Sequence, residues 1–224
     1  MATQVKQHIV TDDLVFCVDK DDPKCNFYGT AKDRAQNITT ASNNSTSQNY
    51  STDSVSTFLS DASQITAMVW VTKTSTSTGY AEHPLNKWQT SGNALGGAAL
   101  ILYHFGNYNS NGDDGEFGFY AGLGGSWSGT SRTTLVVGDS AFLCFQYTAS
   151  TGSQFWRDGK KVHESRQNTG LGNLGTDSVG RNFILYTGPA SNNSYISKVM
   201  IYDKDVDDDV IIHNYNVTKS RFGH

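Results

Sequence analysis

The fold is decided by the C-terminal stretch Tyr195-Ile-Ser-Lys-Val-Met-Ile-Tyr-Asp-Lys-Asp-Val-Asp-Asp-Asp-Val-Ile-Ile-His-Asn-Tyr-Asn-Val-Thr-Lys-Ser-Arg-Phe-Gly-His224. It begins as a strand pattern over 195–202 and continues, through an acidic segment, into one amphipathic helix. Asp205 is a natural N-cap, and Asp207, Asp208 and Asp209 fill a first turn, where the helix dipole favours carboxylates. We therefore predict a helix over about 205–222 that ends at Gly223.

The predicted helix has one apolar face that is suited to cover a sheet. At helical spacing this face holds Val206, Val210, His213 and Val217, flanked by Ile211 and Tyr215.

The chain before the helix is a series of strand patterns separated by short polar breaks. They cover 13–18, 65–72, 98–105, 116–123, 133–137, 141–148, 153–158, 160–165, 181–187 and 195–202. The segment 65–72 is apolar on both faces, which is typical of a strand in the middle of a sandwich. The Asp158-Gly159 pair between two strand patterns is a strong hairpin signal. These patterns predict an all-β fold of two antiparallel sheets.

Length and composition predict one domain. The 224 residues fit a single large β-sandwich over 1–224, with long loops or edge hairpins at 29–63 and 73–97. Only 17% of residues are charged and the net charge is -4, so there is no electrostatic basis for binding nucleic acid.

The sequence also predicts how the protein reaches its place of action. It has no stretch of about 20 apolar residues, so no membrane insertion is expected. The first ten residues lack the apolar core of a signal peptide. A surface rich in Ser, Thr, Asn and Gly nevertheless suits an extracellular or virion protein. Synthesis in a host cytoplasm and release by lysis reconcile these observations.

The three cysteines do not form a zinc site, because no CxxC pair or spaced histidines accompany them. Cys144, in the middle of a strand pattern, is expected to be a small buried hydrophobe. Cys17 and Cys25 flank a short loop, and both a disulfide and two thiols remain open for them.

Several ordered segments resemble a known family. They are Leu14-Val-Phe-Cys-Val-Asp19, Thr66-Ala-Met-Val-Trp-Val71, Phe155-Trp-Arg-Asp-Gly-Lys-Lys-Val162 and Ile196-Ser-Lys-Val-Met-Ile-Tyr202. This succession resembles the concanavalin A-like, laminin-G-like jelly-roll domains. The ending Asn214-Tyr-Asn-Val-Thr-Lys-Ser-Arg-Phe-Gly223 is similar to the closing helix of such domains in structural proteins of tailed bacteriophages, cyanophages in particular. The resemblance implies a two-sheet jelly roll with one C-terminal helix.

Catalysis is not expected. Glycoside hydrolysis needs two carboxylates facing each other across a groove, and the Glu-x-Asp-x-x-Glu string of the glucanases with this fold does not occur. The motifs of serine hydrolases, P-loop enzymes and zinc proteases do not occur either.

The loop from Asn107 to Glu116 is a candidate calcium site, because calcium takes six to eight oxygen ligands in flexible geometry. The candidate ligands are Asn109, Asp113, Asp114 and Glu116. Domains of the resembled family often hold calcium in loops at the rim. A solvated hairpin turn is the alternative, and it is favoured.

Aromatic residues provide candidates for binding a glycan or a partner protein. Those in loops are Tyr80, Trp88, Tyr108 and Trp127, which either stack on sugars or cover the sandwich. Trp70 and Trp156 lie in strand patterns and are expected in the core. The histidines His83, His104 and His213 lack ligand spacing and are expected to be structural or exposed.

Two functions follow as hypotheses. The first is a non-enzymatic virion protein, a capsid decoration or tail-appendage subunit that contacts other virion proteins and forms homo-oligomers. The alternative is a carbohydrate-binding adhesin that recognises host surface polysaccharide. The first is preferred because adhesion requires a site that the sequence does not display.

Overall fold

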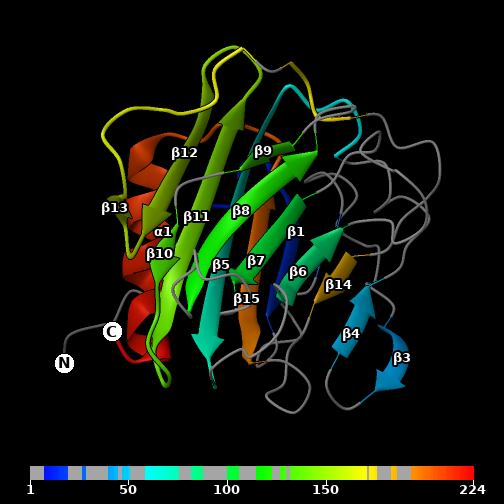
Figure 1. Cartoon of the computed structure of the whole chain (residues 1–224), viewed down its shortest axis with the longest axis vertical. Coiled ribbons are helices and arrows are strands. Elements are labelled where there is room, and N and C mark those ends of the chain that lie inside the picture. Colours follow the sequence, from blue (N-terminus) through cyan, green and yellow to red (C-terminus); the bar gives the residue numbers. More distant parts are fainter. Residues whose placement is uncertain are drawn as a thin grey trace.

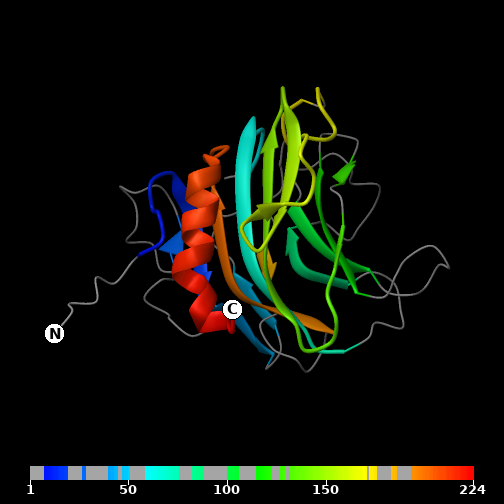
Figure 2. The same cartoon turned by 90° about the vertical axis from the view of Figure 1, so that its left-hand side faces the viewer.

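The chain folds into a two-sheet β-sandwich with a C-terminal helix packed on one side (Figures 1 and 2). In this computed structural model the described residues are 8–19, 27–28, 40–44, 47–50, 59–75, 82–87, 100–105, 115–122, 127–129, 132–170, 172–175, 183–185 and 193–224. All strand pairs are antiparallel. The predicted all-β fold with one terminal helix is confirmed.

The first sheet has the strand order β13-β12-β11-β5-β15-β1-β2. These strands are β13 (Lys160–Lys161), β12 (Gly152–Arg157), β11 (Ser140–Thr148), β5 (Gln64–Lys73), β15 (Ser194–Tyr202), β1 (Leu14–Asp19) and β2 (Phe27–Tyr28). The second sheet has the order β10-β8-β7-β6-β14-β4-β3, with β9 also paired to β8. Its strands are β10 (Thr133–Thr134), β8 (Glu116–Gly122), β7 (Leu100–Phe105), β6 (Glu82–Lys87), β14 (Phe183–Leu185), β4 (Ser47–Tyr50), β3 (Thr40–Asn44) and β9 (Trp127–Gly129).

The central strand β5 shows why the first sheet is apolar on both faces. Val69 and Val71 pack in the core between the sheets, while Met68 and Trp70 pack in a second cluster that includes Ile211 of the helix. Alternate residues of a strand point to opposite faces. A strand between a facing sheet and a covering helix is therefore apolar throughout, as predicted for 65–72.

The helix departs from its predicted limits. It comprises α1 (Asp208–Thr218) and a 3₁₀ turn, Lys219–Phe222, which ends at Gly223 with φ 85°. The N-cap position is Asp207, whose side chain makes no capping bond, so the predicted cap at Asp205 is wrong. The chain before the helix is held extended because Val206 N–H donates to Thr66 Oγ1 at 3.1 Å and Val206 C=O accepts from Gln146 at 2.7 Å.

The buried face of the helix agrees with the predicted one in part: Val206 and Ile211 are buried, and Val210 and Tyr215 pack against the same cluster. Its buried residues are Ile211, Asn214 and Thr218. Asn214 is buried because its amide donates to Tyr202 Oη at 2.7 Å and accepts from Val10 N–H at 2.9 Å. Polar partners on the sheet and the N-terminal segment thus bring Asn214 into a buried face that hydrophobicity alone does not predict. None of the described helices combines the length and apolar character needed to cross a bilayer.

The core predictions for individual residues are largely confirmed. Trp70 and Trp156 are 1% and 2% exposed, but they lie beneath the helix instead of between the sheets. Cys144 is buried in the same cluster, and burial raises the pKa of its thiol well above the ordinary value. His104 is buried and stacks on Phe117 with ring centroids 4.5 Å apart.

The other histidine and cysteine predictions have mixed outcomes. The ring Nε2 of His213 lies 2.8 Å from His8 O, a structural role. The side chain of His83 is outside the description. Cys17 is buried, but Cys25 lies outside the described residues, so a disulfide and two thiols both stay open for this pair.

Hairpins and loops show where local patterns succeeded. Asp158 and Gly159 have φ values of 51° and 74° and join β12 to β13, as predicted. Within 29–63, β3 and β4 form the expected edge hairpin, but within 73–97, β6 is an interior strand between β7 and β14.

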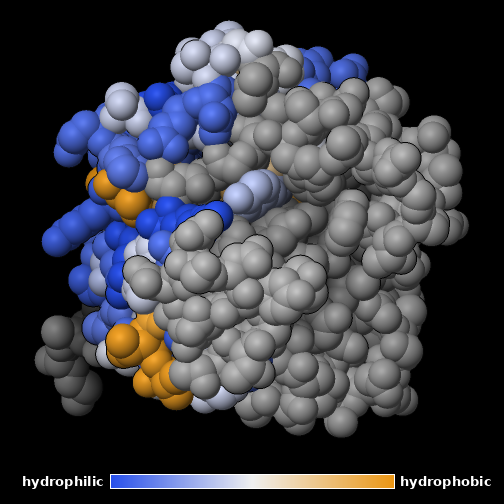
Figure 3. Space-filling model, viewed as in Figure 1, coloured by the Kyte–Doolittle hydropathy of each residue, from blue (hydrophilic) through white to orange (hydrophobic). Residues whose placement is uncertain are grey.

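The predicted strand over 133–137 stops at Thr134. Val136 and Val137 lie in the following turn instead and are 63% and 50% exposed. Figure 3 shows small hydrophobic patches like these on a described surface that is otherwise mostly hydrophilic.

Candidate functional site

Strand β8 divides its residues between the core and the outer face of the second sheet. Phe117, Phe119 and Ala121 are fully buried between the sheets. Because side chains alternate along a strand, the outward register contains the other four residues, Glu116, Gly118, Tyr120 and Gly122. Tyr120 therefore lies between two glycines on this face.

Glu116, Tyr120 and Arg132 form one polar group on the outer face. Arg132 Nη1 donates to Glu116 Oε2 at 2.8 Å, with the side chains 36% and 22% exposed. Burial lowers the pKa of Arg132, but hydrogen bonds with Glu116 and Tyr120 outweigh this, and the net pKa is raised. The group thus joins a fixed cation, a carboxylate and a phenol ring at one place.

Two short strands border this group. Thr134 of β10 pairs with Glu116, and Trp127 of β9 pairs with Gly122. Figure 1 shows β8 and β9 side by side on the face toward the viewer. The resulting face carries hydrogen-bond donors, acceptors and an aromatic ring within three neighbouring strands.

The predicted ligand-binding aromatics are only partly located. Trp127 belongs to β9, beside the strand that carries Tyr120; its side chain is outside the description. Tyr80, Trp88 and Tyr108 lie outside the described residues, so their role stays a prediction.

Most of the candidate calcium ligands also lie outside the described residues. Asn109, Asp113 and Asp114 lie outside the described residues. Glu116 is described, and its carboxylate accepts a hydrogen bond from Arg132. No group of three or more His, Cys, Asp or Glu side chains suited to a metal occurs among the described residues. The calcium site stays untested.

Tyr120 and Arg132 were missed as candidates from the sequence. The alternation in Glu116-Phe-Gly-Phe-Tyr-Ala-Gly122 places Tyr120 on the face of Glu116, and this signal was available. The position of Arg132 depends on pairing between β10 and β8, which no local pattern reveals.

No protein-family profile matches the sequence, and no curated protein matches it. Among solved structures, the chain is similar to the receptor-binding domain of botulinum neurotoxin C/D mosaic serotype, with TM-score 0.59 and 9% identity over 92% of this chain and 52% of that one. It is also similar to the serotype G binding domain, with TM-score 0.56 and 8% identity over 81% and 42%.

A type C botulinum neurotoxin structure, described by the dependence of cell entry on two ganglioside molecules, gives TM-score 0.51 and 11% identity over 76% and 39%. The chain thus spans about half or less of the length of these structures. At such identities the likeness establishes a shared fold, the jelly-roll β-sandwich.

Proposed function

We propose that this protein is a non-enzymatic, adhesin-like module that binds cell-surface glycans through the outer face of β8, β9 and β10. The observation that carries the proposal is the group of Glu116, Arg132 and Tyr120. The resembled toxin structures support it as a class, since two are binding domains and a third is described through gangliosides.

The chemistry of the group suits a sugar. An aromatic ring offers an apolar surface with a polar tip, which matches the C–H face and the hydroxyls of a pyranose. The planar carboxylate accepts two hydroxyl hydrogen bonds, and the guanidinium donates in a fixed fork geometry. Gly118 and Gly122 in the same register are buried, so Glu116 and Tyr120 are the partly exposed positions that β8 offers to a ligand.

The same group does not suit hydrolysis of the glycan. Glycosidases place two carboxyl groups about 5–5.5 Å or 6.5–9.5 Å apart. Within the described part of this face, Glu116 has an arginine as its near neighbour. The charge pairing favours binding over proton transfer.

The proposal is tested by screening the full chain on a glycan array and measuring affinity for the strongest ligand. We expect Tyr120→Ala to weaken binding at least tenfold, which corresponds to about 1.4 kcal/mol. Tyr195→Ala is the matched control, because Tyr195 is also half-buried but belongs to β15 of the other sheet. An array without ligands, or equal affinity of Tyr120→Ala and the wild type, would refute the proposal.

A second proposal concerns where the module acts. The low charge content and the Ser-, Thr- and Asn-rich surface favour display on a phage particle, as a capsid decoration or tail-appendage subunit that contacts other virion proteins and forms homo-oligomers. Mass spectrometry and reconstruction of purified particles test this. A particle without the chain would reject the virion location but leave glycan binding intact.

A further inference from the structure

Cationic side chains gather where the two sheets meet at one edge of the sandwich. Arg157, the last residue of β12 in the first sheet, reaches β10 in the second. Its Nη1 donates to Thr133 Oγ1 at 3.0 Å and to Thr134 O at 2.8 Å. Figure 1 shows β10, β12 and β13 together on this side. The guanidinium therefore bridges the open edge.

Lys160 of β13 pairs directly with Arg157. Directly opposed residues in antiparallel strands have Cβ atoms about 4.5–5.5 Å apart, and like charges at such positions are destabilising. Lys160 is exposed and has no ion-pair partner among the described residues. Lys160 is thus a cation without a described counter-charge, and it lies beside a second cation, Arg157.

The next lysine provides a contrast. Lys161 lies 2.6 Å from Asp208 Oδ2 and its ammonium lies 5.1 Å from the centroid of Trp156. Lys161 thus has partners within the protein, a carboxylate and an aromatic ring, that account for its position. Lys160 has no such partner in the described part of the chain, so its charge is available to a ligand there.

The acidic side chains that the structure describes near the edge, Asp158 and Glu116, are already engaged. Asp158 Oδ2 accepts from Arg157 Nε at 3.2 Å, while Asp158 Oδ1 accepts from Phe142 N–H at 2.9 Å. Glu116 is paired with Arg132. Among the described residues one carboxylate thus balances each arginine, and Lys160 leaves an excess of one positive charge.

The edge also offers donors for an anion. The structure gives Arg157 Nη2 and the exposed Thr134 hydroxyl no hydrogen-bond partner among the described residues. A guanidinium, an ammonium and a hydroxyl are the usual donors to carboxylate and sulfate groups. We call Thr134, Arg157 and Lys160 the edge cluster.

We infer that the edge cluster binds the acidic groups of a negatively charged polysaccharide, an inference that rests on the proposed glycan-binding function. Thr134 pairs with Glu116, so the cluster adjoins the face that carries Tyr120. A polysaccharide that contacts Tyr120 with one sugar places a neighbouring carboxylate or sulfate at the edge. The cluster then selects acidic over neutral glycans.

The test compares three immobilised polymers with one backbone: dextran, carboxymethyl dextran and dextran sulfate. We expect the full chain to bind at least one charged polymer several-fold more tightly than dextran, with an affinity that falls as salt is added. The charged polymer that binds better identifies carboxylate or sulfate as the preferred group.

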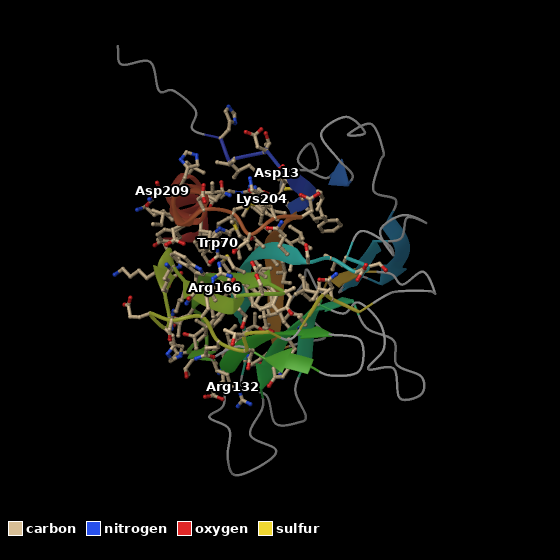
Figure 4. All side chains as sticks on the ribbon, turned by 90° about the horizontal axis from the view of Figure 1, so that it is seen from above. Asp13, Trp70, Arg132, Arg166, Lys204 and Asp209 are labelled. Carbon is tan, nitrogen blue, oxygen red and sulfur yellow. The ribbon has the colours of Figure 1, made fainter. Side chains whose placement is uncertain are left out.

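Two substitutions locate the effect. Lys160→Gln is expected to lower affinity for the charged polymer about three- to tenfold, and Lys160→Glu to lower it further; both should remain folded because the side chain is exposed. Lys204→Gln, the same charge change at another exposed lysine, is the control. Figure 4 places Lys204 well away from Arg132, which directly precedes β10.

The outcomes separate the two proposals. Equal binding of charged and neutral polymers, or equal losses for Lys160→Gln and Lys204→Gln, would overturn the edge cluster even if Tyr120→Ala abolishes glycan binding. Charged-polymer binding that depends on Lys160 but not on Tyr120 would support the edge cluster and reject the face around Tyr120.

Discussion

A buried carboxylate anchors the end of the chain to the first sheet. Asp19, at the end of β1, is fully buried. Arg221 Nη1 and Nη2 lie 2.5 Å from its two oxygens, and Lys198 Nζ of the neighbouring strand lies 3.2 Å from Oδ2. Lys198 is only 5% exposed. Asp19 therefore compensates a lysine that is almost fully buried.

We predict that Asp19→Asn lowers the free energy of unfolding by about 3–5 kcal/mol, the usual cost of removing one partner from a buried ion pair. The loss is large because Lys198 remains buried without its counter-charge. For a domain of this size 1 kcal/mol corresponds to about 2–4 °C. The melting temperature should therefore fall by about 6–20 °C.

Urea denaturation and calorimetry measure this change. Arg221→Met should cost less than half as much, because its side chain is 37% exposed and Lys198 still faces Asp19. The double variant Asp19→Asn/Lys198→Met should regain part of the loss, since it removes the buried ammonium. A loss below about 1 kcal/mol for Asp19→Asn, or a double variant less stable than the single one, would refute the reasoning.

Three further predictions concern packing, protonation and the helix. Gly152→Ala should cost about 2–4 kcal/mol in urea denaturation, because φ is +82° and a Cβ would lie 2.2 Å from Gln167 O; an unchanged midpoint would contradict this. Partial desolvation and the nearby Asp13 carboxylate raise the pKa of Asp203, so its ionisation weakens the fold as pH rises through that pKa. Asp203→Asn should raise the melting temperature slightly at pH 7 but not at pH 3, below the unfolded value of about 3.9. Trp70→Phe removes the 2.9 Å bond from Nε1 to Thr218 Oγ1 and should cost about 1–3 kcal/mol, with faster hydrogen exchange in α1; unchanged exchange would count against it.

Local signals predicted the strands well and the helix boundaries less well. Alternation and the Asp158-Gly159 turn depend on neighbouring residues, and both were confirmed. The helix start was wrong because Thr66 and Gln146, which lie far away in the sequence, hold Val206 in an extended segment. Asp205 instead accepts a hydrogen bond from Arg166 at 2.6 Å.

The candidate site shows the same division. The position of Glu116 and Tyr120 on one face follows from the period of a strand. Arg132 lies beside them because β10 pairs with β8. Arg157 lies beside Thr134 because the edges of the two sheets are in contact.

The amino-acid sequence alone determined the fold class, the order of most strands along the chain and the presence of one terminal helix, because the period of apolar residues and the turn residues act over a few positions. The tertiary structure alone decided which helix face is buried and which charges meet at the outer face and the open edge. Those features depend on contacts between residues far apart in the chain, such as Asn214 with Val10 and Arg157 with Thr133.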